Sequence, residues 1–249
     1  MYEEKRRPQQ NDGSGRCQIC GTTLQYGSAQ SPVVCRVCGL QEVANVVCTS
    51  GHYVCEGCHE QEYYSLLAGY ALTLTSQDPM AIAESLLRET MLLQNGNEHY
   101  ALPVVALLTA LKNYGAIPLP GGEVRSIDEE DIREGIRRVR QIPPCACAYL
   151  GACGAGLGVG IVVSILFHAH CEQDIERSLT MRASQTAVAA IANSGGPACC
   201  KQSVRTAVLV GSQLLKEMLR VYLPLSRSKC FFQAANHAGC KGARCSFGR

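Results

Sequence analysis

The sequence predicts a mainly α-helical protein, in which a small cysteine-rich module precedes a helical domain and an irregular cysteine-rich tail follows it. The 249 residues are 47% hydrophobic, enough to bury a sizeable core. Cysteines cluster in close pairs before residue 60, whereas apolar residues recur at helical spacing after it, with no convincing strand alternation. We therefore expect a disordered tail over 1–16, a metal-binding module over 17–59 and a helical cysteine-rich domain over 60–249.

Charge and cysteine content narrow the class of protein. With 23 basic and 21 acidic side chains, the chain has no overall attraction for nucleic acid, membranes or acidic substrates. The polar N-terminus shows no apolar stretch typical of a secretory signal, so we expect a cytoplasmic protein whose thiols stay reduced. Sixteen cysteines, many in close pairs, then favour metal binding over the alternative of a disulfide framework.

Two hairpins of the zinc-knuckle type open the module. They read Cys17-Gln-Ile-Cys20-Gly and Cys35-Arg-Val-Cys38-Gly. Each places two thiolates on one tight turn, and the following glycine supplies the backbone conformation that the turn requires. Four sulfurs suit a tetrahedral ion, so the spacing predicts a zinc-ribbon-like module with a structural zinc bound by Cys17, Cys20, Cys35 and Cys38.

A second donor group follows directly, with the pattern Cys-x3-His-x2-Cys-x2-Cys. We expect a second zinc bound by Cys48, His52, Cys55 and Cys58, with His59 as a fifth donor. Cross-bracing, in which ligand pairs alternate between the two ions as in RING-type folds, remains open, as does a reactive thiol pair without metal.

The helical domain is predicted from apolar periodicity and from start and stop signals. Pro79 suits a first helical position, Ser126 to Glu129 reads as a capping box, and Gly195-Gly196 ends a helix. The expected helices cover 60–75, 78–95, 99–114, 126–142, 175–193 and 197–222.

The run from Cys145 to Ala169 carries no formal charge and is long enough to cross a bilayer. Its glycines, cysteines and histidines suit a lipid-facing helix poorly. We favour a buried core helix, in which glycine permits close approach of neighbouring backbones, and keep a membrane span as the alternative.

A second population of cysteines lies on the helical domain and its tail. Cys199 and Cys200 fall in the first turn of a helix, where the helix dipole and Lys201 favour a thiolate that serves as nucleophile or metal ligand. The tail cysteines, Cys230, Cys240 and Cys245, form no tight pair, so we expect the tail to wrap around a cofactor.

The chain resembles an uncharacterised family of unknown function, found mostly in methanogenic archaea and anaerobic bacteria. The resemblance covers most of residues 48–247. It is carried by Gly51 to His59, His99 to Pro103, Leu150 to Gly156, the Gly-Gly-Pro-x-Cys-Cys-Lys element at 195–201, and the Cys230 to Cys245 tail. The family has no activity to carry over, but the resemblance implies an anaerobic host, in which an oxygen-sensitive 4Fe-4S iron–sulfur cluster is feasible.

Our first functional hypothesis is a metalloprotein in which zinc is structural and a cysteine-bound iron–sulfur cluster performs thiol, sulfur or redox chemistry. The partner would be a small thiol or sulfur substrate, or a redox protein. Candidate cluster ligands are Cys153, Cys199, Cys200, Cys230, Cys240 and Cys245. The candidate catalytic residues are Cys199, Cys200 and His99, with His168 and His170 as further acid–base candidates. A third zinc in the tail is the alternative to the cluster.

The second hypothesis is a non-enzymatic zinc-binding adaptor or regulator that binds a partner protein or nucleic acid. Nucleic acid is the less favoured partner because only Tyr26 and Tyr53 offer stacking faces near the zinc knuckles. The glycine-rich stretch at 154–160 lacks the strand context of a dinucleotide-binding loop.

Overall fold

The computed structural model describes residues 17, 20, 22–27, 32–36, 38–89, 96–233 and 240–248, except for the side chains of 56, 59–62 and 89. The expected N-terminal tail over 1–16 lies outside the described residues. The chain divides into two compact units, Met1–Tyr63 and Tyr64–Arg249, and the division falls inside a helix, α1 (Glu56–Thr73). Each unit is described by itself below.

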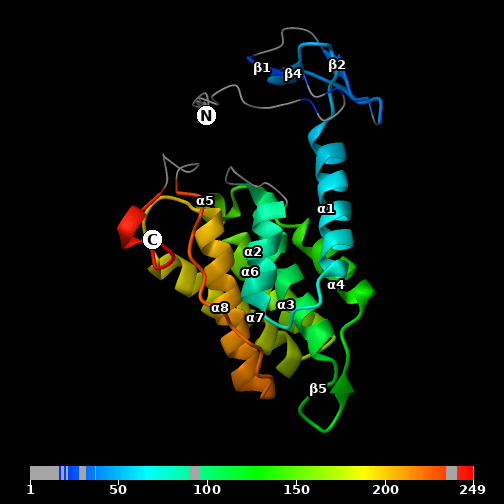
Figure 1. The fold of residues 1–249 in the computed structure, drawn as a ribbon. Helices are drawn as coiled ribbons and strands as arrows, with labels where there is room; N and C mark the ends of the chain where they lie inside the picture. Colours follow the sequence, from blue (N-terminus) through cyan, green and yellow to red (C-terminus); the bar gives the residue numbers. More distant parts are fainter. Residues whose placement is uncertain are drawn as a thin grey trace. The chain divides into compact units, whose positions relative to one another are not determined.

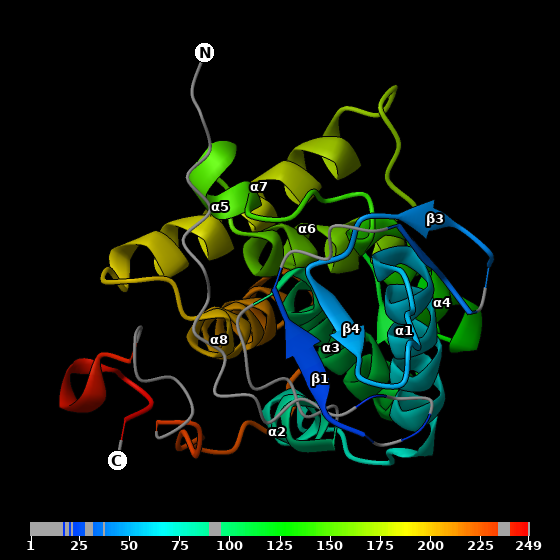
Figure 2. The same cartoon turned by 90° about the horizontal axis from the view of Figure 1, so that it is seen from above.

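The first unit is built on four very short strands. β1 (Leu24–Tyr26) pairs antiparallel with β4 (Val46–Cys48), and β2 (Val33–Val34) pairs antiparallel with β3 (Gln41–Glu42). The β1–β4 pair is visible in Figure 2. Strands this short bury little apolar surface, and most of the unit's buried hydrophobic positions are cysteines: Cys17, Cys35, Cys48 and Cys55, joined by Ala44.

The second unit is mainly helical, as expected (Figure 1). One two-stranded hairpin, β5 (Ile117–Pro118) with β6 (Val124–Arg125), was not predicted. The α-helices after α1 are α2 (Pro79–Glu89), α3 (Ala101–Tyr114), α4 (Glu129–Val139), α5 (Ala146–Tyr149), α6 (Gly154–Leu166), α7 (Ile175–Asn193) and α8 (Cys200–Leu219), and the 3₁₀ turns are η1 (Asn97–Tyr100) and η2 (Gly242–Arg244).

Helix α3 is the centre of the helical unit. Residues 101–111 are all buried, and α3 contacts α2, α4, α6 and α8. Neighbouring helices approach it closely at glycines. A side chain at Gly211 of α8 would begin 2.5 Å from Leu107, and one at Gly135 of α4 would begin 2.7 Å from Val104. Both positions exclude any larger residue without repacking, which explains the glycines.

The uncharged run at 145–169 is broken into two helices. Cys145 adopts a left-handed conformation (φ 57°) before α5, and Gly151 (φ 71°) separates α5 from α6. Helix α6 has 13 residues, ten of them buried, which agrees with the expected core helix. Within the part of the chain that the structure describes, no helix combines the length and apolar character needed to cross a membrane.

Helix starts depend on local side chains, and two of them differ from expectation. Asp78 accepts hydrogen bonds from the Met80 and Ala81 amides, so α2 begins at Pro79 as predicted. The capping box of α4, however, joins Asp128 with Asp131 and not Ser126 with Glu129. Similarly, α8 begins at Cys200, with Cys199 as its extended N-cap.

The segment after α8 runs back along α2 (orange in Figure 1). The Ser226 amide donates to Asp78, the Ser228 hydroxyl bonds to Glu84, and the Arg88 guanidinium lies 4.4 Å from the centre of the Phe231 ring. These three contacts are spaced along one helix. They hold the segment so that Cys230, the first cysteine after α8, lies near the N-terminal end of α8. There it lines a cavity together with Cys199.

Candidate metal centres

The structure gathers the eight predicted zinc ligands into two groups of four. One group contains Cys17, Cys20, Cys48 and His52, and the other contains Cys35, Cys38, Cys55 and Cys58. Within each group the ligand atoms all lie within 4.8 Å of one another. The sites therefore alternate along the chain, as in a cross-brace. The expected serial pairing, in which the two knuckles share one ion, is wrong.

Antiparallel pairing of β1 with β4 explains the alternation. Leu24, four residues after Cys20, stands opposite Cys48 at the end of β4, which carries Cys48 to the first knuckle. The two knuckles are also built alike: the amide of Cys17 donates to the Thr22 carbonyl, and that of Cys35 donates to the Leu40 carbonyl, both at 2.8 Å. These equivalent turns present two sulfurs each.

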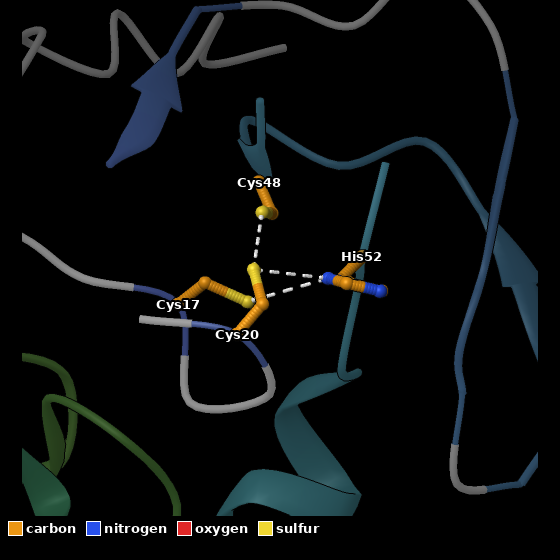
Figure 3. A group of neighbouring side chains, drawn as sticks. All are labelled: Cys17, Cys20, Cys48 and His52. Atoms are coloured by element: carbon orange, nitrogen blue, oxygen red, sulfur yellow. Dashed lines mark hydrogen bonds between the residues drawn. The ribbon is translucent and has the colours of Figure 1, made fainter. Parts of the chain in front are cut away.

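The first site is shown in Figure 3. The Cys20 sulfur lies 3.5 Å from the Cys48 sulfur and 3.2 Å from His52 Nδ1, while the Cys17 sulfur lies 3.9 Å from His52 Nδ1. In a tetrahedral site with zinc–sulfur bonds of about 2.3 Å, ligand atoms are separated by about 3.5 to 4 Å. The Cys20–Cys48 and Cys17–His52 separations fall within this range, and the Cys20–His52 separation is slightly shorter.

Thr22 lies against two of the sulfurs of this site and favours their thiolate form. Its hydroxyl lies 3.0 Å from the sulfurs of both Cys20 and Cys48. The hydrogen bond from Thr22 lowers the pKa of the Cys48 thiol to about 5 and also lowers that of Cys20, whereas the hydrogen bond with Cys20 raises the pKa of His52. A thiolate is the form that binds zinc, so Thr22 favours the ligand state of both cysteines.

The second site consists of four thiols. The sulfurs of Cys38 and Cys55 are 3.6 Å apart, and the Cys55 amide donates to the Cys35 sulfur at 3.3 Å. Hydrogen bonding to Cys38 and then to Cys55 raises the pKa of Cys58 to about 12. Without a cation the Cys58 thiol thus retains a proton that a bound ion would release. The side chain of His59 lies outside the described residues.

In the helical unit, four more cysteines surround one cavity. Cys199 comes from the N-cap of α8, Cys230 from the segment along α2, and Cys240 and Cys245 from the C-terminal tail. The cavity volume is about 20 Å³. The tail is held in place because the Cys230 amide donates to the Phe247 carbonyl at 2.7 Å and Lys241 donates to the Ser194 carbonyl at 2.7 Å.

Three cationic side chains line the same cavity, and two of them, Lys201 and Arg205, are buried while Lys241 is partly exposed. Lys201 and Arg205 are each only 1% exposed. Arg205 pairs with Glu84 at 2.6 Å, and the Lys201 ammonium lies 5.4 Å from the centre of the Phe232 ring. Buried positive charge stabilises thiolates and anionic metal–thiolate groups, so the cavity fits a cysteine-bound metal group in its charge as well as its donors.

The spacing of these four sulfurs bears on whether the cavity would hold a single zinc ion or an iron–sulfur cluster. Among the described residues, no three ligand atoms of this cavity lie within 4.8 Å of one another, unlike those of the two ligand groups in the first unit. A single zinc ion would draw its sulfurs to about 4 Å, whereas an iron–sulfur cluster holds its cysteines farther apart. The present volume of about 20 Å³ is that of a single ion, so a cluster would need a wider cavity than the one described.

Two predicted cluster ligands are placed elsewhere. Cys153 and Cys200 line a second cavity, of about 270 Å³, together with Cys147 and Tyr100. Cys199 lines both cavities. Burial raises the pKa of Cys200 to about 11, so the expected thiolate at the start of the helix is not what this environment favours at Cys200. The dipole and Lys201 do not overcome burial there.

The three histidine candidates lie apart from these cavities. His99 is 1% exposed, and neither ring nitrogen makes a hydrogen bond of normal geometry. Burial, followed by the charge of Lys201, lowers its pKa to about 3, against a smaller opposing effect of the Gly96 carbonyl. His168 and His170 are exposed after α6. Nothing in this geometry gives the three histidines a shared site.

Several residues that build these sites were not singled out from the sequence. Thr22 follows a knuckle by two residues, and Arg205 lies one helical turn after Lys201, which are weak signals by themselves. Tyr100 was overlooked beside His99, although it is Tyr100 that lines a cavity.

Comparison with protein families gives one match. The model of the Family of unknown function (DUF5714) matches residues 67–248. The chain belongs to this family. The DUF5714 region contains both cavities of the helical unit, and the eight clustered zinc-type ligands precede it, as does the Gly51 to His59 element. Neither curated proteins nor solved structures yield a match to the chain.

Proposed function

We propose that this DUF5714 protein is a metalloprotein with two structural zinc ions in its N-terminal unit and a cysteine-bound iron–sulfur cluster in the tail cavity, acting in thiol, sulfur or redox chemistry. The observation that carries the proposal is the convergence of Cys199, Cys230, Cys240 and Cys245 on one cavity lined by two buried cations. These cysteines come from three separate segments, so the fold has to bring them together.

The surroundings of the cavity suit a redox group. A cluster with thiolate ligands is anionic, and Lys201 with Arg205 would stabilise its more reduced, more negative state. Phe232 and Phe247 also line the cavity, where their rings limit access of water. When bound, the cluster would supply one-electron transfer or an iron site for a sulfur ligand.

The zinc sites, by contrast, support a structural role. Each has four protein donors, which leaves no open position for a substrate or water on a tetrahedral ion. Their cysteines are also much of what the first unit buries, so metal binding there is coupled to folding.

Cysteine variants test the cluster. We expect anaerobically purified protein to have broad visible absorbance and an electron paramagnetic resonance signal after reduction. Cys240→Ala should lose both, while the matched control Cys171→Ala, an exposed cysteine outside the cavity, should retain both. A different result would contradict the cluster: wild-type protein that is colourless and contains a third zinc ion, which Cys240→Ala loses. The tail cavity would then be a zinc site.

The second candidate, an adaptor, is favoured by apolar side chains exposed on the first unit. Val34, Leu40 and Val43 are 47%, 51% and 63% exposed, on and beside the β2–β3 pair. Such a patch suits a protein partner better than nucleic acid. An adaptor role predicts that Leu40→Asp abolishes a specific cross-link to a partner in cell extract without changing zinc content. Cross-linking that survives Leu40→Asp would contradict it.

A further inference from the structure

The 270 Å³ cavity beside the tail has the features of a ligand pocket. It lies between Tyr100, helix α5, the N-cap of α6, the end of α7 and the first turns of α8. Its volume falls just below the range of about 300 to 1,000 Å³ that drug-sized ligands occupy, which suits a small molecule.

The chemical character of the pocket excludes a charged ligand. Its lining comprises thiols, hydroxyls, one amide and small apolar groups, and no charged side chain is among the described residues that line it. A charged ligand in such a site would lose hydration without gaining an opposite charge, which is unfavourable. Four cysteines contribute to it, namely Cys147, Cys153, Cys199 and Cys200. A thiol side chain is small, apolar and polarisable, with only a weak S–H donor, so these four suit a ligand whose inner end is another polarisable, weakly polar group such as a thiol.

Tyr100 supplies a hydrogen-bond donor. Its ring packs on Gly154, where an added side chain would begin 2.3 Å from the ring, so the ring is fixed from behind. Burial, reinforced by the neighbouring Cys147, Cys200 and Cys153, raises the pKa of Tyr100 to about 12. The phenol is therefore protonated and available to donate to a ligand.

The pocket also adjoins the tail cavity. Cys199 and Gln202 line both, so a ligand in the larger cavity lies against residues that form the wall of the proposed cluster site. A substrate placed there would be next to the cluster but outside the four-cysteine shell.

We infer that the pocket formed by Tyr100, Cys147, Cys153 and Cys200 binds a small uncharged thiol, with its sulfur among the cysteines and its polar end hydrogen-bonded to the Tyr100 hydroxyl. The inference rests on the proposed function, because it gives the cluster a substrate class. The binding event itself requires no cluster chemistry.

The test is titration calorimetry on the full-length, metal-loaded protein under anaerobic, reducing conditions. The probes are 2-mercaptoethanol, ethylene glycol, which replaces the sulfur with oxygen, and mercaptoacetate, which adds a charge. We expect 2-mercaptoethanol to bind at least tenfold more tightly than either analogue. Tyr100→Phe should weaken its binding several-fold, since the ring and its packing on Gly154 remain.

A pair of alanine variants on α7 controls for folding. Ala192 lines the pocket and is exposed, whereas Ala189, one turn earlier, is exposed outside it. Ala192→Phe should abolish 2-mercaptoethanol binding with the visible spectrum unchanged, and Ala189→Phe should bind like wild type. Equal binding of all three probes, or unchanged binding in both Ala192→Phe and Tyr100→Phe, would overturn the inference. Iron and sulfide content should be measured on the same samples. Normal iron and sulfide together with either of these binding results would contradict the thiol inference alone, whereas protein without iron and sulfide would contradict the cluster proposal.

Discussion

The two units use cysteine in opposite ways. In the first unit, strands of two or three residues bury almost no aliphatic side chains, and the sulfurs themselves occupy the interior. In the second unit, α3 and its neighbours form a large apolar core, and the cysteines stand at its margin, around the start of α8. Cysteine thus replaces a core in one unit and is added to a complete core in the other.

The proposed division between structural zinc and a functional metal group rests on this contrast. A unit without a core depends on its ions for folding, so loss of metal is loss of structure. A unit with its own core can lose a metal group and remain folded, which leaves its thiols available for chemistry.

Chelation of zinc should have the largest effect. We expect a strong chelator to unfold the first unit, since structural zinc in small domains contributes about 10 kcal/mol or more, while the helices after α1 remain intact. Amide hydrogen exchange of the full-length chain measures both units in one experiment. Protection that survives chelation in β1 and β4 would contradict the account, as would loss of protection in α3.

Paired substitutions should then distinguish the two ligand schemes. Cys20 and Cys48 share a site in the structure, whereas Cys20 and Cys38 belong to different sites. We expect the Cys20→Ser/Cys48→Ser protein to lose one zinc ion and the Cys20→Ser/Cys38→Ser protein to lose both. Serial pairing would give the reverse zinc contents, measured by elemental analysis of purified protein.

Within the helical unit, removal of Glu84 should be the most damaging single change. Glu84→Ala leaves the buried guanidinium of Arg205 without its 2.6 Å carboxylate partner, at a cost of about 3 kcal/mol in the free energy of unfolding. Urea denaturation measures this change. The control is Glu129→Ala, which breaks a largely exposed pair with Arg133 and should cost no more than about 0.5 kcal/mol. Equal effects would show that burial of Arg205 is unimportant.

Acid should weaken the helical unit through His99. Its pKa of about 3 in the folded state lies below the ordinary value of 6.5, so the unfolded chain takes up the proton first. Stability should therefore fall as the pH drops below 6.5, by about 2 kcal/mol at pH 5. His99→Leu should remove most of this dependence in denaturation curves at pH 7 and pH 5. An unchanged pH dependence in His99→Leu would assign the acid lability to other groups.

Local sequence patterns identified the metal-binding side chains well, but they did not identify which of these side chains share one ion. Spacing of two or three residues between cysteine and histidine donors is a property of one turn, and it identified all eight ligands that the structure groups. Which turns share an ion depends on the pairing of β1 with β4, a contact between segments that no local pattern encodes. The same limit applies to α4, where Asp128 and Ser126 are both reasonable caps and tertiary context selects Asp128.

Burial sets the environment of the thiol site in ways that the sequence does not indicate. Cys200 has the helix start and the neighbouring lysine that favour a thiolate, yet its position in the folded chain raises its pKa. His99 and Tyr100 are adjacent in sequence, and only the turn of η1 decides that Tyr100 lines a cavity while His99 enters the core. Such choices follow from packing across distant segments.

The central claim is that the chain holds two kinds of metal site, and elemental content tests it most directly. Zinc, iron and acid-labile sulfide should be measured together on full-length protein purified without oxygen. The account predicts about two zinc ions per chain together with several iron and sulfide ions. Zinc alone, with the thiols of Cys199, Cys230, Cys240 and Cys245 free to react with alkylating reagents, would contradict it.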